Sequence, residues 1–140
     1  MATFNKFDCF VEDLAEKRHD LGADLLKIML TNVAPVATNT VKANLTEIAA
    51  AGGYTAGGTA ATISSSSQTS GTYKLVLADV TFTATGAVGP FRYFVLYNDT
   101  PTSPADPLIG WWDYGAQITL ANTETVTADF SATNGAIQIA

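Results

Sequence analysis

The side chains most often used in catalysis are scarce in this chain, which holds one histidine and one cysteine. A nucleophilic site needs a serine or cysteine beside a histidine that a third group orients. His19 lies near the end of a predicted N-terminal helix, where a partly exposed cation suits the helix dipole. Cys9 lies between Phe7 and Phe10 on that helix, and we interpret it as a small hydrophobic residue. We therefore expect no catalytic residue and no enzymatic activity.

Six carboxylates follow Glu47, mostly at turn and loop positions: Asp79, Asp99, Asp106, Asp113, Glu124 and Asp129. A glycosidase uses two carboxylates about 5–10 Å apart across a cleft, but any six scattered acids offer such pairs. Asp99 and Asp106 flank a proline-rich loop and could share a calcium ion with backbone carbonyls, yet their spacing is not that of an EF-hand. Turn capping explains these acids better. We expect no metal ligands and no cofactor.

The pair Trp111–Trp112 lies in an apolar run before Tyr114. Adjacent residues of a strand point to opposite faces, so one indole should enter the core while the other faces outward. An outward indole near Tyr114 could serve a subunit contact or a platform for a sugar ring. We interpret the pair as core plus subunit contact.

The bulk composition excludes several classes of partner. The net charge is −6, and only two cations, Lys74 and Arg92, follow Glu47, which argues against binding of nucleic acid through phosphates. The glycine-rich GGYTAGG lacks the lysine and the following helix of a phosphate-binding loop. One cysteine permits no intrachain disulfide. Neither a signal peptide nor an apolar run of about 18 residues is present, so we expect no membrane partner and synthesis in a cytoplasm.

The N-terminal segment carries the pattern of an amphipathic helix over Asn5 to Arg18. Apolar residues recur at the spacing i, i+3, i+4 and i+7, and charged residues occupy the other face. Two alternatives remain open: the helix packs against the rest of the domain, or it is an arm that docks on a neighbouring subunit. An arm could be deleted without unfolding the remainder. We divide the chain into a helix or arm over residues 1–22 and one β-sandwich domain over residues 23–140.

Short strands with turn signals every eight to twelve residues fill the rest of the chain. The segment Gly89–Gly115 organises them: two aromatic, apolar runs flank a loop with three prolines, which predicts a long hairpin or two strands crossing between sheets. Alternation over Thr72–Thr85 changes face at Ala78-Asp79, which indicates a bulge or bend. The sequence predicts an all-β fold, a β-sandwich or jelly-roll-like domain of about eight strands with one N-terminal amphipathic helix.

Several segments together resemble a known protein family. They include FNKFDCFVEDLAEKRHDLGADLLKIMLTNVAP, LTEIAAAGGYTAGG, SGTYKLVLADVTFTATG and, as the most specific, RYFVLYNDTPTSPADPLIGWWDYG. Over nearly the whole chain, the sequence is similar to small virion structural proteins of tailed bacteriophages and prophages. The resemblance implies a non-enzymatic protein of the virion, made in the host cytoplasm. The implied role is capsid decoration as a cement protein on the outer head surface, and a tail or neck component is the close rival.

The resemblance also implies partners, namely the major capsid protein and further copies of this chain, with a trimer as our hypothesis. We expect the subunit or capsid interface at six aromatic residues: Phe4, Phe7, Phe10, Trp111, Trp112 and Tyr114. Nucleic acid, membrane and small-molecule ligands are not expected. A competing class is a carbohydrate-binding β-sandwich module, which would require an exposed tryptophan in a groove.

Overall fold

The two longest strands form an antiparallel hairpin at the centre of the main sheet in the computed structural model, which describes residues 2–140. They are β7 (Val88–Asn98) and β8 (Leu108–Leu120), and the proline-rich loop joins them. The predicted hairpin is therefore confirmed. The main sheet has the order β1-β8-β7-β2-β3, in which β1 is Asn5–Lys6, β2 is Leu26–Thr31 and β3 is Thr59–Ala60.

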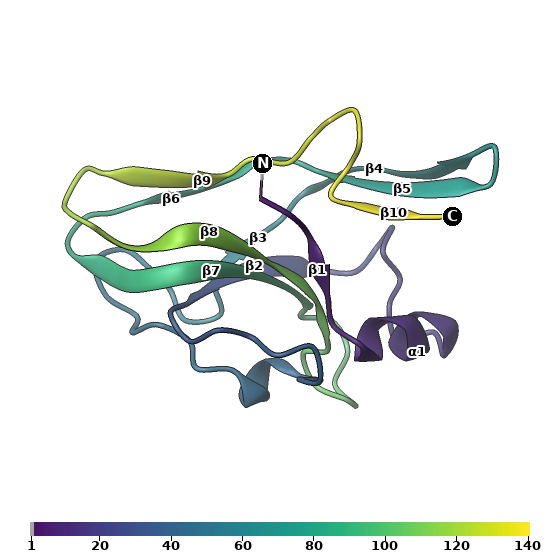
Figure 1. The fold of residues 1–140 in the computed structure, drawn as a ribbon, viewed down its shortest axis with the longest axis horizontal. Helices are drawn as coiled ribbons and strands as arrows, with labels where there is room; N and C mark the ends of the chain where they lie inside the picture. The colour runs from purple at the N-terminus through teal and green to yellow at the C-terminus, as the bar shows by residue number, and fades with distance from the viewer. Residues whose placement is uncertain (1) are drawn as a thin grey trace.

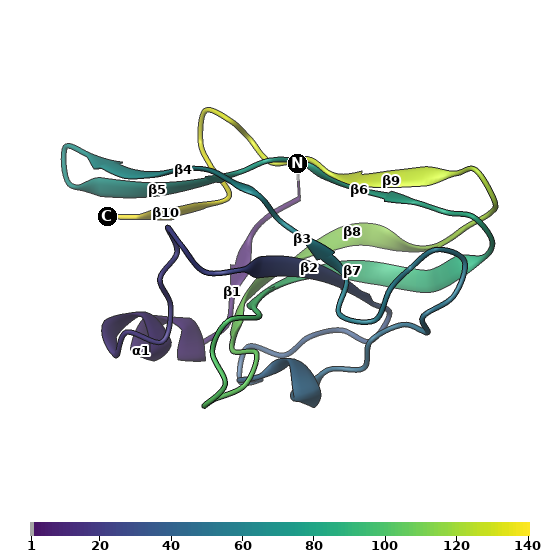
Figure 2. The same cartoon turned by 180° about the vertical axis from the view of Figure 1, so that it is seen from behind.

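Two smaller sheets lie over one face of the main sheet (Figure 1), and the view from behind in Figure 2 shows the same two layers. One has the order β10-β5-β4, built from Ile137–Ile139, Thr72–Leu77 and Ile63–Thr69. The other pairs β6 (Val80–Thr83) with β9 (Thr125–Ala128). The layers form a β-sandwich, so the predicted all-β class is confirmed. Two of its strands, β1 and β3, have only two residues each.

The chain passes from one small sheet to the other between β5 and β6, at Ala78 and Asp79. The sequence predicted a change of face at these residues, and Leu75 and Leu77 before them are buried, as are Val80 and Phe82 after them. A single strand could not bury both sets on one face, because side chains alternate with a period of two. Asp79 Oδ1 accepts a hydrogen bond from the backbone N–H of Phe130 at 2.8 Å, which ties the crossing to the segment after β9.

Buried apolar clusters lie on both faces of the main sheet. The larger cluster fills the space between the two layers and includes Leu30, Phe91 and Phe94. The smaller cluster consists of Phe7, Met29, Val95, Tyr97 and Leu108. In Figure 1 the segment 32–58, with its 3-10 turn η1 (Lys42–Asn44), passes beneath the main sheet. Burial on both faces explains the nearly continuous apolar runs of β2 and β7.

The N-terminal helix is shorter than the sequence predicted, since α1 spans Cys9–Ala15 rather than Asn5–Arg18. Asn5 and Lys6 instead form β1, where Asn5 is the register partner of Trp111. The Asn5 side-chain amide also donates to the Trp111 carbonyl at 3.3 Å. Pairing with a distant strand edge thus overrides the local helical pattern.

The helix lies against the β-domain, the first of the two alternatives for this segment. Phe10 belongs to the larger buried cluster, and Leu14 packs against it. Asp13 is buried, and its carboxylate accepts a hydrogen bond from Arg18 Nη1 at 2.7 Å. Lys17 then adopts φ 64°, a left-handed conformation that ends the helix.

Candidate functional site

Three of the six residues expected at a subunit or capsid interface lie inside the chain. Phe7, Phe10 and Trp112 are 0%, 3% and 7% exposed. The prediction is wrong for these residues because each fills space that the sandwich closes by itself. Phe7 belongs to the smaller buried cluster, and the other two belong to the larger one. Their aromatic character reflects the core of one chain.

Two further residues of that set lie partly buried at the edge of the main sheet. The Phe4 ring lies 5.2 Å from the Trp112 ring, centroid to centroid, and covers Gly110, where any Cβ would collide with it. The Trp111 ring lies 4.5 Å from the Phe7 ring. The two indoles point to opposite faces as predicted, but Trp111 packs against the smaller cluster instead of standing free. Neither indole forms an exposed platform.

Tyr114 is the one residue of the set with a largely exposed side chain, at 52%. The register between β7 and β8 shifts here: Tyr93 pairs with Asp113 and Phe91 pairs with Ile118, which leaves extra residues on β8. Asp113 holds the start of this bulge, because Arg92 donates to its two oxygens at 2.7 and 2.9 Å. These hydrogen bonds lower the pKa of the Asp113 carboxyl.

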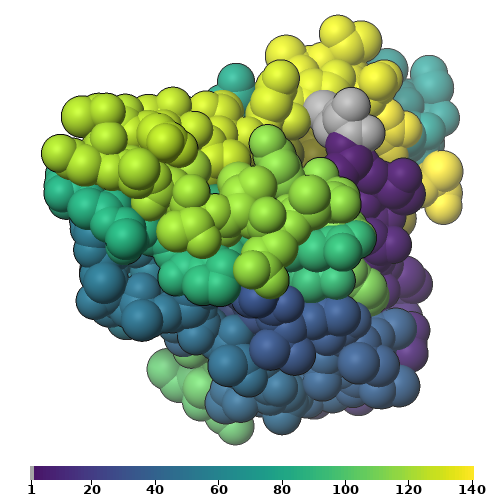
Figure 3. Space-filling model, turned by 60° about the vertical axis from the view of Figure 1, so that its left-hand side comes forward, coloured from purple at the N-terminus to yellow at the C-terminus, as the bar shows by residue number. Residues whose placement is uncertain are grey.

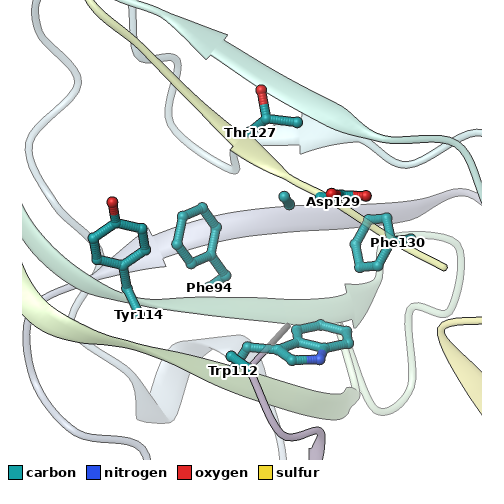
Figure 4. Close-up of a pocket in the computed structure, with 8 residues that line it drawn as sticks. Phe94, Trp112, Tyr114, Thr127, Asp129 and Phe130 are labelled. Carbon is teal, nitrogen blue, oxygen red and sulfur yellow. The ribbon is translucent and has the colours of Figure 1, made fainter.

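The bulge positions Tyr114 beside a pocket between β8 and β9, on the open side of the sandwich. Figure 3 brings this side forward, with β8 and β9 above and the segment 32–58 below. The pocket has a volume of about 270 Å³. Figure 4 shows its aromatic side chains together with two polar ones from β9 and the segment after it, namely Phe94, Trp112, Tyr114, Phe130, Thr127 and Asp129. Of these residues, Trp112 and Tyr114 were expected at a site from the sequence, whereas Phe94 and Phe130 were not, since only the packing of two sheets brings them together.

His19 is buried, at 6% exposure, and not the partly exposed cation that we predicted. Asn98 Nδ2 donates to His19 Nδ1 at 3.1 Å and to Asp24 Oδ2 at 2.7 Å. Nδ1 is therefore an acceptor, and within residues 2–140 the Nε2 atom has no hydrogen-bond partner. Burial lowers the pKa of His19, and the nearby carboxylates of Asp13 and Asp24 oppose that shift. The ring serves as a neutral part of the interior.

Cys9 and the carboxylates near the proline loop form no recognisable catalytic set. Burial, followed by the nearby carboxylate of Asp13, raises the pKa of the Cys9 thiol to about 11, which keeps it protonated. Burial and the neighbouring Asp99 raise the pKa of Asp106. Asp99 itself forms a salt bridge with Lys27 at 3.0 Å. The ammonium group thus supplies the positive charge that the sequence analysis assigned to a possible calcium ion.

No model of a protein family, no curated protein and no solved structure matches this chain. Within residues 2–140, no helix has the length and apolar character needed to cross a membrane. No three His, Cys, Asp or Glu side chains of these residues gather as a metal-binding set. Function has to be inferred from the geometry and from the sequence resemblance.

Proposed function

We propose that this protein is a virion structural protein of a tailed bacteriophage, without enzymatic activity, and that it decorates the outer surface of the head. The resemblance carried by the segments quoted in the sequence analysis, RYFVLYNDTPTSPADPLIGWWDYG above all, supports this role. A decoration protein buries surface at the joints between capsomers, so that pressure from packaged DNA must break those contacts first. A specific, stable contact buries roughly 1,200–2,000 Å². The partners are then the major capsid protein and further copies of this chain.

The free edge of β4 is the observation that carries the proposal. β4 has the sequence ISSSSQT, and Ser64 to Thr69 are exposed. The whole stretch from Ile48 to Tyr73 contains no charged residue. β4 is the outer strand of its sheet, and within residues 2–140 no backbone hydrogen bond joins it to a further strand. Proteins usually protect such edges with charges, prolines or short strands, because an unpaired edge is a template for another strand.

The other edges of the sandwich show those protective features. The main sheet ends in β1 and β3, which have two residues each. Beyond Trp111, the edge of β8 is interrupted by the register shift and carries Asp113. β9 has four residues and lies between Glu124 and Asp129. β4 is the long, uncharged exception, and we assign it to strand addition with a neighbouring chain in the particle.

The carbohydrate-binding alternative loses its main support. A sugar platform requires an exposed aromatic face, and the sequence analysis assigned that role to a tryptophan. Trp112 is 7% exposed and Trp111 packs on Phe7. A free β4 edge suits a tail or neck component equally well, and binding to isolated heads and tails separates the two locations.

The test is to mix purified protein with isolated heads, and separately with isolated tails, of the parent phage and to sediment each mixture. Saturable co-sedimentation with heads is the expected result, and the copy number per head would identify the symmetry axis that the protein occupies. Binding to tails alone would refute decoration and move the protein to the tail. Binding to neither particle would refute the virion role.

A further inference from the structure

We propose that the pocket between β8 and β9 is a binding site for a small organic cation of the alkylammonium class. No small-molecule ligand was expected from the sequence, in which the residues that make this pocket are far apart. They come from β7, β8, β9, the segment after β9 and, with Ala2, the N-terminal segment. The proposal does not depend on the virion role.

Aromatic rings form the walls of the pocket. Phe94 and Tyr114 have ring centroids 6.3 Å apart and stand on one side. Trp112 and Phe130, at 5.4 Å, stand below and on the other side, as Figure 4 shows. The planes within each pair are inclined by 48° and 64°, so the rings enclose a space and do not form one flat surface. Aromatic faces arranged around a space attract cations through their quadrupoles.

The charge of the pocket points the same way. Among residues 2–140, Asp129 is the charged residue of the lining, and no Lys, Arg or His side chain of these residues lines the pocket. Asp129 takes part in no salt bridge within residues 2–140. The net charge of −6 adds a favourable field for a cation. An anionic ligand would meet the carboxylate without compensation.

A sugar or a neutral apolar ligand fits the pocket less well. A sugar presents several hydroxyl groups, whereas the Thr127 hydroxyl here is hydrogen-bonded to that of Thr81 at 3.0 Å, which leaves Asp129 and the hydroxyl of Tyr114. A neutral apolar ligand would make no use of the carboxylate. The volume of about 270 Å³ lies just below the usual range for ligand pockets, which suits a small head group.

The experiment compares two ligands of one shape, choline and its uncharged isostere 3,3-dimethylbutan-1-ol, by titration of the full chain followed by NMR. Choline should bind saturably and shift the indole N–H resonance of Trp112. The isostere should bind about tenfold more weakly, since it lacks the cation–π and carboxylate attractions. Trp111, on the opposite face of the sheet, is an internal control whose resonance should stay in place. Equal binding of the two ligands, or binding of methyl glucoside in preference to choline, would overturn the proposal.

Single-residue variants test whether choline binds in this pocket. Asp129→Asn keeps the shape and removes the charge, and Tyr114→Leu removes one exposed wall; each should weaken choline binding about fivefold or more. Glu124→Gln changes the net charge equally, away from the pocket, and should bind choline like the unaltered protein. Loss of affinity in Glu124→Gln equal to that in Asp129→Asn would refute a local site. Sedimentation with phosphatidylcholine vesicles, against phosphatidylglycerol vesicles, would show whether a lipid head group or a free cation is the natural source.

Discussion

At the scale of single residues, His19 shows how burial reverses an expectation made from sequence. The residue follows a helix, where a charged imidazole would be stabilised. The structure instead places its ring 5.4 Å from the Phe10 ring and fixes Nδ1 by a hydrogen bond from Asn98. A proton added to this ring would place a charge in the interior, which costs free energy.

His19 therefore makes stability depend on pH. Its pKa in the folded state is below the ordinary value of 6.5, so the unfolded chain binds the proton first. The free energy of unfolding should fall as the pH drops below about 6.5 and level off below the folded-state pKa. Urea titrations at several pH values between 5 and 8 measure this slope. His19→Gln should flatten the slope; equal slopes in both proteins would contradict the assignment of a buried neutral ring.

At the scale of elements, the hairpin β7–β8 could be predicted because aromatic and β-branched residues favour strands and its loop holds three prolines. Which side chains of β7 point between the two layers could not be predicted. Simple alternation pairs Phe91 with Tyr93, but the shifted register places Phe94 with Phe91 in the larger cluster. The apolar run of β7 is nearly continuous, so its pattern does not reveal a bulge that depends on the partner strand.

The faces of β7 give a second prediction. Phe91→Ala and Phe94→Ala should each lower the free energy of unfolding by about 3–5 kcal/mol, because both rings are buried between the layers. Tyr93→Ala should cost about 1 kcal/mol, since that side chain is only half-buried. Denaturant unfolding measures all three. A larger loss of unfolding free energy for Tyr93→Ala than for Phe94→Ala would contradict this placement and favour simple alternation along β7.

The segment before α1 supplies a third prediction. An arm for docking on a neighbour could lose its aromatic residues without unfolding the chain, whereas the structure buries Phe7 completely. Phe7→Ala should cost about 3–5 kcal/mol of unfolding free energy in the isolated protein. Val11→Ala is the matched control: it lies on α1, is 54% exposed and should change stability by less than about 0.5 kcal/mol. Equal, small effects would favour the arm.

At the scale of the whole molecule, the fold class could be predicted from turn spacing and alternation, whereas the sites could not. The chosen aromatic residues were the most apolar ones, and in a sandwich those fill the core: Phe7, Phe10 and Trp112 are examples. The free strand edge is instead that of the Ser-rich β4, whose small polar side chains give no sign of a binding surface in the sequence. Whether a strand has a free edge depends on which strands are outermost in a sheet, and sequence periodicity does not contain that information.

The central claim is that the β4 edge joins this protein to its neighbours in the particle. In the hairpin β4–β5, Thr69 pairs with Thr72 across a two-residue turn, so the N–H groups of alternate residues, Ser66 among them, face outward. Ser66→Pro removes this N–H, while Ser66→Ala keeps it. The measurement is the binding of both variants to isolated heads by co-sedimentation, with thermal unfolding to confirm that both are folded. Ser66→Ala should bind like the unaltered protein and Ser66→Pro at least about fivefold more weakly. Equal binding of the two folded variants would contradict the claim.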